Sequence, residues 1–209
     1  MLKRVFSISL AMVMILSLGA CGPKRESAQS VAEKAILAVK NVDYATTQAY
    51  WGKGALEDVS KAADVEPDEQ SSEIMKLLTK NLSYSITNSQ EDEQAGTATV
   101  SVDFTNTNMS LVMAEYIKTA MSDIFTYAFL PEDQQPTDEE LEQMYMEKLT
   151  ELMSSDDNET VTKSVDITLT LVDDQWQIDT SNAAEVLDAM LGGILSYAES
   201  MSEQFGDFE

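Results

Sequence analysis

The sequence predicts an α+β fold in which a four-stranded antiparallel sheet, made of two hairpins, is covered by helices. Two stretches alternate strictly between polar and apolar residues, and each doubles back after a turn rich in Asp, Glu or Gly. Elsewhere the apolar residues recur at helical spacing. Because alternation buries only one face of a sheet, we expect N-terminal helices to cover the apolar side, with a two-helix insertion and a C-terminal helix added.

The helices before the sheet follow from 3-4 spacing of apolar residues. This spacing is clear over 28–39 and predicts an amphipathic helix. A second helical stretch is expected over 45–63, interrupted near Gly52 and Gly54, and a third over 71–80. These segments precede the first strand and would pack on the apolar face of the sheet.

Each hairpin consists of two alternating segments. The first pairs 82–87 with 97–104 around the acidic, Gly-containing turn 91–96. The second pairs 164–171 with 175–179 around Asp173-Asp174. One face of every strand is polar, which predicts a sheet with one solvated face.

Two long helices are expected between the hairpins. The stretch 110–130 is apolar nearly all round, so either other helices bury it or its second face is a groove for a lipid or a peptide. The next helix starts at a capping box, Thr137 to Glu140. A last helix from 182 to 201 contains Gly192-Gly193, each Gly costing about 1 kcal/mol relative to Ala. This pair predicts a kink or a close contact with another helix, and a homodimer seam is the weaker alternative.

The N-terminus has the form of a secretory leader. Lys3 and Arg4 precede an apolar run of 14 residues, 5–18, which is shorter than the roughly 20 that a membrane-spanning helix needs. We therefore expect a signal peptide of residues 1–20, and a retained short anchor is the weaker alternative. The leader ends in a four-residue motif, Leu18, Gly19, Ala20 and Cys21.

This motif resembles the lipobox of bacterial lipoproteins. The resemblance implies that the sulfur of Cys21 receives a diacylglyceryl group and that Cys21 becomes the new N-terminus. Two acyl chains, of the palmitate kind, anchor a protein stably where one does not. Residues 21–28 are then the lipidated cysteine and tether, and the protein would lie on the extracytoplasmic face of the cell membrane. The alternatives for a lone cysteine are a free thiol or an intermolecular disulfide.

Composition excludes several functions. The 209 residues contain 37 Asp and Glu, 13 Lys and Arg, one Cys and no His, for a net charge of −24. Histidine-dependent triads, His-ligated zinc, internal disulfides and Cys-ligated iron–sulfur clusters are therefore excluded. The negative charge argues against nucleic acid as a partner. Without its leader the chain is 189 residues long, which fits a single domain over 29–209 with a helical insertion at 108–154.

A second resemblance to a known family rests on the order of the helices and hairpins and on the residues that close the final hairpin. The second hairpin closes on Asp174-Gln-Trp-Gln-Ile-Asp179. This segment is similar to the acidic-Gly-Trp-Lys-Ile-Asp pattern that ends the final hairpin in a group of uncharacterised lipoproteins of Gram-positive bacteria. Those lipoproteins have a nuclear-transport-factor-two-like, or cystatin-like, domain. In this chain Gln175 and Gln177 stand in place of the Gly and the Lys. The resemblance covers about 29–179. The insertion and the last helix depart from the pattern, and would fill or cap the open pocket of that fold.

Enzymes of that superfamily resemble ketosteroid isomerase or scytalone dehydratase, which gives one set of candidate pocket residues: Asp43, Tyr44, Tyr50, Trp51 and Tyr84. Asp43 would be the base. It also lies where a helix ends and a turn begins, a common place for an Asp that bonds locally. Since no nucleophile–base pair can be identified, we predict no catalytic residues, and the isomerase- or dehydratase-like enzyme is the alternative function.

Metals and cofactors are not predicted. The acidic clusters lack the Asp-x-Asp-x-Asp-Gly spacing of an EF-hand, so an ordered calcium site is not expected. The methionines, concentrated in the second half, favour core packing over an adaptable partner surface or a soft-metal site. The leading hypothesis is a membrane-anchored, non-catalytic module that binds a peptide, an envelope protein or a small apolar ligand.

Overall fold

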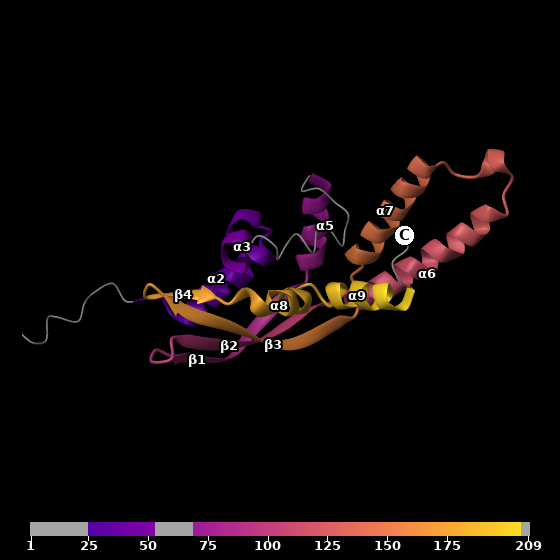
Figure 1. The fold of residues 1–209 in the computed structure, drawn as a ribbon. Helices are drawn as coiled ribbons and strands as arrows, with labels where there is room; N and C mark the ends of the chain where they lie inside the picture. Colours follow the sequence, from indigo (N-terminus) through magenta and orange to yellow (C-terminus); the bar gives the residue numbers. More distant parts are fainter. Residues whose placement is uncertain (1–24, 53–68, 206–209) are drawn as a thin grey trace, which may run out of the picture.

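The structure is a computed structural model that describes residues 25–52 and 69–205. The expected leader, the motif with Cys21 that resembles a lipobox, and the part of the second expected helix beyond Gly52 lie outside the described residues. The predicted sheet is confirmed, with four antiparallel strands in the order β1-β2-β3-β4 (Figure 1). The strands are β1 (Ser83–Asp92), β2 (Thr97–Thr107), β3 (Thr160–Val172) and β4 (Gln175–Ile178).

The two faces of the sheet differ as the alternation predicts. Val100, Val102 and Phe104 of β2 are buried, and Ile167 and Leu169 of β3 lie beside them in the same core cluster. Their neighbours in sequence are Thr, Ser and Asp, and these form the other, polar face. In β1 a bulge between Ile86 and Asn88 shifts the pairing by one residue. The core therefore lies on one side of the sheet only.

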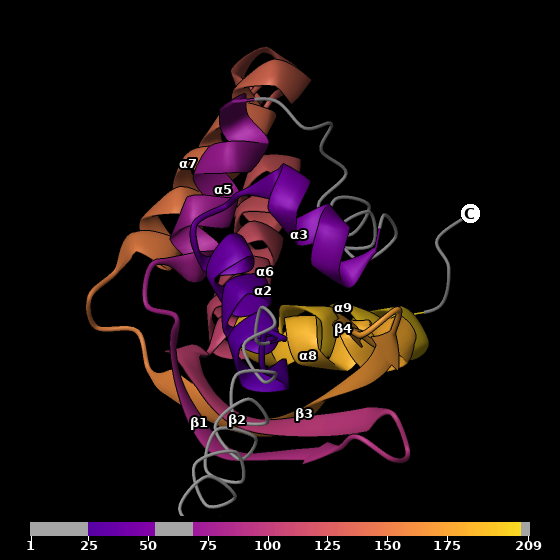
Figure 2. The same ribbon diagram turned by 90° about the vertical axis from the view of Figure 1, so that its left-hand side faces the viewer.

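The N-terminal part that the structure describes has three helices, and the first of them packs on the inner face of the sheet. They are α2 (Ala28–Lys40), α3 (Tyr44–Trp51) and α5 (Glu69–Thr79). The hydroxyl of Ser27 caps α2 by accepting a hydrogen bond from the Ser30 N–H, and the stripe Val31, Ala35 and Ile36 is buried against the sheet. Figure 2 shows α2 lying over the strands, with α3 and α5 farther from them.

The two helices between the hairpins form an antiparallel pair, α6 (Met109–Ala128) and α7 (Asp138–Ser154), joined by a short 3-10 turn, η1 (Glu132–Gln134). The predicted capping box is confirmed: the Thr137 hydroxyl accepts a hydrogen bond from the Glu140 N–H at 3.3 Å, and the Glu140 carboxylate accepts one from the Thr137 N–H at 2.9 Å. The pair projects from the rest of the molecule (Figure 1). We call residues 109–154 the arm, and residues 121–144 its tip.

A second core cluster holds the base of the arm. It joins Met109 and Val112 of α6 to Met153 of α7 and to residues of α5, with Leu191 below them. Asn106, fully buried at the end of β2, donates hydrogen bonds from its amide to the carbonyls of Leu78 and Met190, both at 2.7 Å. These contacts fix the arm at its base and leave its far half to extend alone.

The C-terminal segment differs from the single helix that the sequence predicts. After a 3-10 turn, η2 (Thr180–Asn182), it forms two helices, α8 (Ala183–Met190) and α9 (Ile194–Phe205). The break lies at Gly192 and Gly193, whose φ angles are +68° and +88°. The Asp188 carboxylate accepts a hydrogen bond from the Ser196 N–H at 3.0 Å and so caps the new helix. The predicted kink is present as this break, and the predicted close approach is present as well. Gly192 lies against Thr107 at the end of β2 and against Met109, the first residue of α6.

Candidate functional site

Asp43, the candidate base, is the N-cap of α3 and is exposed. Its carboxylate accepts hydrogen bonds from the Thr46 hydroxyl at 2.7 Å and from the Thr46 N–H at 3.0 Å. These two bonds lower the pKa of Asp43. A solvated carboxylate that is stabilised in its charged form is a weak proton acceptor, and this geometry is that of a helix cap.

The four candidate aromatic residues are not gathered around Asp43. Trp51 is only 1% exposed, and its indole N–H donates to the Ala35 carbonyl at 3.1 Å, which makes it a core residue of the α2–α3 contact. Tyr50 and Tyr84 pack at the edge of the same core cluster. Tyr44 packs against the second cluster, at the base of the arm.

Tyr50 lines a cavity of about 460 Å³ together with Trp176 and Arg25. The Arg25 guanidinium stacks over the Trp176 ring at 5.4 Å and pairs with Asp174 at 2.7 Å and with Glu93. Glu93 and Asp174 lie in the turns of the two hairpins. Arg25 therefore ties the start of the described domain to the turn end of the sheet, which is a structural role.

The tip of the arm carries the largest exposed apolar side chains of the described residues. Phe129 is 87% exposed, Phe125 63% and Ile124 57%, and Met121 and Met144 are also exposed. By contrast Met109 at the base of the same helix is 1% exposed. Scattered exposed apolar residues are ordinary, but several within two helical turns form a patch of the kind that marks an interaction surface. The alternative that neighbouring helices bury this helix is thus wrong for its second half.

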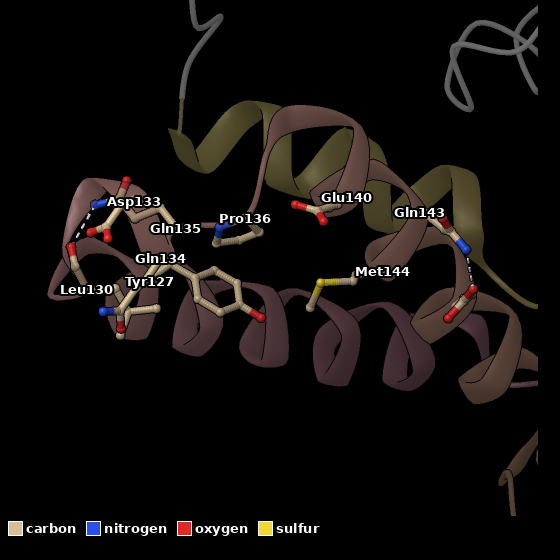
Figure 3. Close-up of a pocket in the computed structure, with 10 residues that line it drawn as sticks. Tyr127, Leu130, Asp133, Gln134, Gln135, Pro136, Glu140, Gln143 and Met144 are labelled. Atoms are coloured by element: carbon tan, nitrogen blue, oxygen red, sulfur yellow. Dashed lines mark hydrogen bonds between the residues drawn. The ribbon is translucent and has the colours of Figure 1, made fainter.

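A cleft of about 670 Å³ lies between the two helices and the loop that joins them. It is on the α7 side of α6, whereas Phe125 and Phe129 face the other way. In Figure 3, Tyr127 of α6 and Met144 of α7 extend into the space between the helices, with Pro136 above them. The remaining lining residues are mostly polar: Leu130, Asp133, Gln134, Gln135, Glu140, Gln143 and Glu147. Hydrogen bonds from Gln135 to the Leu130 carbonyl and from Gln143 to Glu147 hold the walls.

The arm is strongly acidic. It contains ten Asp and Glu residues and two Lys, a net charge of −8. Both lysines pair within their own helix, Lys118 with Glu115 at 3.0 Å and Lys148 with Glu151 at 2.9 Å. The backbone N–H and hydroxyl of Thr137 lower the pKa of Glu140 by hydrogen bonding, which keeps this carboxylate ionised at the rim of the cleft. The arm is thus negative overall, and the carboxylates that line its cleft are on the side of α6 away from the exposed phenylalanines.

Two further properties concern the described part of the chain. Among residues 25–52 and 69–205, no group of three or more Asp, Glu, His or Cys is placed to hold a metal ion. Of the helices in the same ranges, none is both long and apolar enough to cross a membrane.

The sequence of this chain and its structure were each compared with known proteins. No family model matches the sequence, and no curated protein matches it. Among solved structures, the chain is similar to the crystal structure of a "putative lipoprotein (ycdA)" from Bacillus subtilis subsp. subtilis str. 168. The two share 17% identity with a TM-score of 0.46, and the match covers 79% of this chain and 56% of that one. This chain therefore spans little more than half the length of that protein.

Sequence reasoning identified 110–130 as apolar all round but did not single out Phe125 or Phe129. A signal was present: Met121, Phe125 and Phe129 are four residues apart and therefore lie on one stripe of α6. The stripe reaches the end of the helix, just before Pro131, where few other elements could cover it.

Proposed function

We propose that this chain is a lipid-anchored extracytoplasmic protein whose arm binds a protein partner without catalysis. The observation that carries the binding role is the exposure of Phe125 and Phe129 at the tip of the arm. Exposing two phenylalanine side chains is unfavourable by about 2 kcal/mol each relative to burying them, and a partner that covers them recovers this free energy.

The lipobox motif supports the anchor. Cys21 precedes Arg25 by four residues, so the Cα atoms of the two residues would lie within about 14 Å of each other. Arg25 is bound to Glu93 and Asp174 at the turn end of the sheet, and the arm projects from the opposite end (Figure 1). An anchor at Cys21 would therefore hold the hairpin turns near the membrane and the tip of the arm away from it.

The cystatin-like resemblance belongs to the same proposal. It is supported by a first helix packed on an antiparallel sheet and by a final hairpin that includes the buried Trp176. Catalysis receives less support, because Asp43 is exposed and capped by Thr46, and the aromatic candidates do not surround it. The arm projects from the end of the domain opposite the hairpin turns and has a net charge of −8. Both properties favour a role in presenting a binding surface.

Acylation of Cys21 tests the anchor. Cells that express the protein are labelled with a radioactive or clickable palmitate, and the Cys21→Ser variant is compared with the natural chain. We expect label and membrane fractionation for the natural chain and neither for the variant. Equal fractionation of the two proteins would exclude the lipid anchor.

Site-specific photo-crosslinking tests the binding role. A benzophenone amino acid replaces Phe125 in the full chain, and the control replaces Val172, which is exposed on the body of the domain. After irradiation of intact cells, we expect a discrete protein adduct from position 125 and none from position 172. Identical patterns from both positions, or no adduct at position 125, would refute the proposed function.

A further inference from the structure

We propose that the outer face of the sheet binds a neutral polysaccharide. This face is separate from the arm, so the inference goes beyond the proposed function and does not rest on it. Three observations carry it. Two strands repeat one pattern of polar residues, a hollow lies at the centre of that pattern, and the residue types do not suit the other common partners.

The two central strands have the same polar pattern on their outer side. Every second residue of β2 from Thr97 to Thr107 reads Thr-Thr-Ser-Asp-Thr-Thr, and so does every second residue of β3 from Thr160 to Thr170. Because the strands are antiparallel and in register, an approximate local two-fold axis relates the two copies. Solvent exposure requires only that these residues be polar, whereas here the residue types repeat as well. The cross-strand pairs are Thr97–Thr170, Thr99–Thr168, Ser101–Asp166, Asp103–Ser164, Thr105–Thr162 and Thr107–Thr160.

The first five of these pairs form one accessible surface, which we call the hydroxyl face. The last pair is left out because Thr107 is buried and its hydroxyl accepts a hydrogen bond from the Asn81 amide at 2.9 Å. Thr97, Thr162 and Thr170 are exposed, and the other members of the face are exposed or half-buried. Figure 1 shows the labelled helices on the opposite side of the sheet. A large ligand can therefore reach all five pairs.

The hydroxyl groups of this face are held in place, and several are unused. A β-branched threonine side chain is restricted at χ1, so its hydroxyl loses little freedom when a ligand binds. The hydroxyls of Thr105 and Thr162 bond each other at 2.7 Å. The Ser164 hydroxyl donates to the Asp103 carboxylate at 2.6 Å. Four further hydroxyls can bond a ligand, because among the described residues they have no protein partner: those of Thr97, Thr99, Thr168 and Thr170.

A hollow of about 560 Å³ lies at the centre of the hydroxyl face and is lined by both Ser–Asp pairs. Asn182 and Glu185, which follow β4 in the chain, and Thr87 at the bulge of β1 also line it. Its volume is in the range of small-ligand sites. The carboxylates in it can accept hydrogen bonds from sugar hydroxyls, and bonds to a charged acceptor are the stronger kind. The hollow thus offers one or two sugar units a concave seat.

The residue types of the hydroxyl face disfavour other partners. The face has no Lys or Arg and two Asp, whereas nucleic acids and other polyanions are bound through basic residues. It also has no aromatic or large apolar side chain of the kind that anchors most protein interfaces. A sugar hydroxyl both donates and accepts, as the hydroxyls of Ser and Thr do. Successive pairs are about 6.8 Å apart along the strands, and the two members of a pair about 4.8 Å apart across them, so a short run of sugar rings meets several hydroxyls.

Co-sedimentation with insoluble polymers tests this inference. The full chain, in a polyoxyethylene detergent that carries no sugar, is mixed with particles of cellulose, chitin or crosslinked polygalacturonate and centrifuged. We expect the protein in the pellet with cellulose or chitin, and in the supernatant with the anionic polygalacturonate. The neutral polymer that retains the protein identifies the sugar. Raising the salt from roughly 0.05 M to roughly 0.5 M should change the pelleted fraction by less than about twofold, because no ion pair is formed.

Matched variants test whether the hydroxyl face carries the binding. Thr99→Val with Thr168→Val removes two hydroxyls that have no protein partner, so we expect binding to weaken at least about fivefold. Valine keeps the β-branching of threonine and suits a strand, and urea unfolding checks that the variant is folded. The control is Thr126→Val with Thr150→Val, which removes two exposed hydroxyls from the arm and should leave binding unchanged.

Several results would overturn the inference. One is a protein that stays in the supernatant with both cellulose and chitin, and another is equal binding by the Thr99/Thr168 variant and its control. Equal pelleting with polygalacturonate and the neutral polymers would show unspecific adsorption. Dimers that the Thr99/Thr168 variant abolishes would identify a second copy as the occupant. Phe125→Ser with Phe129→Ser should leave polysaccharide binding unchanged, so this inference and the proposed function of the arm can fail separately.

Discussion

Gly192 lies so close to Thr107 that a Cβ atom at position 192 would be 1.9 Å from the Thr107 carbonyl oxygen. The Gly192 carbonyl in turn accepts a hydrogen bond from the Met109 N–H at 3.0 Å. The end of β2, the first residue of the arm and the break between α8 and α9 therefore meet at one point. The orientation of the arm depends on this junction.

The Gly192→Ala substitution tests the junction. The new methyl group would collide with backbone at a residue whose φ is +68°, so we expect a loss of about 3 kcal/mol or more in the free energy of unfolding. Gly96→Ala is the control, because Gly96 has the same φ but its nearest contact, Leu171 Cβ, is at 3.7 Å. That variant should lose only about 1–2 kcal/mol in urea unfolding. Equal losses would show that the contact with Thr107 is unimportant.

Asn106 connects three elements beneath the arm. Its amide donates to the carbonyls of Leu78 and Met190, and its side-chain oxygen accepts from the Thr107 N–H at 2.8 Å. Asn106→Ala leaves these buried groups unpaired, so we expect a loss of about 2–4 kcal/mol by chemical denaturation. Asn81→Ala removes one partly exposed hydrogen bond and should cost below about 1 kcal/mol. A similar cost for both would contradict this role.

The pair Lys163–Asp188 predicts a dependence of stability on pH. Burial alone raises the pKa of Asp188, but hydrogen bonds from Lys163, at 2.7 Å, and from Ser196 outweigh it, so the pKa is lowered. A lowered folded-state pKa stabilises the protein above the unfolded-state value of about 3.9, and this stabilisation is lost as pH falls through the folded-state pKa.

Asp188→Asn measures that contribution. Because Lys163 is partly exposed, we expect the variant to be about 2 kcal/mol less stable at pH 7, and the difference to shrink as the pH falls toward 3. Urea unfolding at several pH values gives both numbers. A difference that stays constant across this range would mean that the ionised pair does not stabilise the fold.

The tip of the arm should contribute little to folding. Phe129→Ser removes a side chain that is 87% exposed, so we expect a change within about 0.5 kcal/mol. Met109→Ala at the base removes a buried side chain and should cost about 2–5 kcal/mol. If Phe129→Ser destabilised the protein as much as Met109→Ala, the tip would be part of the core and not a binding surface.

The sequence predicts the elements well because periodicity reports burial directly. The alternation around Val100 and Ile167 predicts both strands and the polar outer face, and the Thr137–Glu140 pair predicts the start of α7. The break at Gly192 was harder to predict. Its cause is a contact with Thr107, eighty-five positions earlier, and the apolar spacing on both sides continues as if the helix were unbroken.

The candidate site was predicted less well than the fold. Asp43 and the nearby aromatic residues suggest a pocket from their types alone, but local hydrogen bonds engage Asp43 and the core engages Trp51. The exposure of Phe125 depends on where the arm leaves the domain. Spacing along α6 identifies its apolar faces, and only the tertiary arrangement decides which face has a neighbour.

The most direct test of the account measures how the anchored protein is oriented. Cys21 is the sole cysteine and would be acylated, so a new cysteine can be labelled alone, either in Gln94→Cys at a hairpin turn or in Phe129→Cys at the tip. With the lipidated protein in vesicles that carry a headgroup-attached quencher, we predict strong quenching at position 94 and little at position 129. Strong quenching at position 129 would contradict an arm that is held away from the membrane for a protein partner.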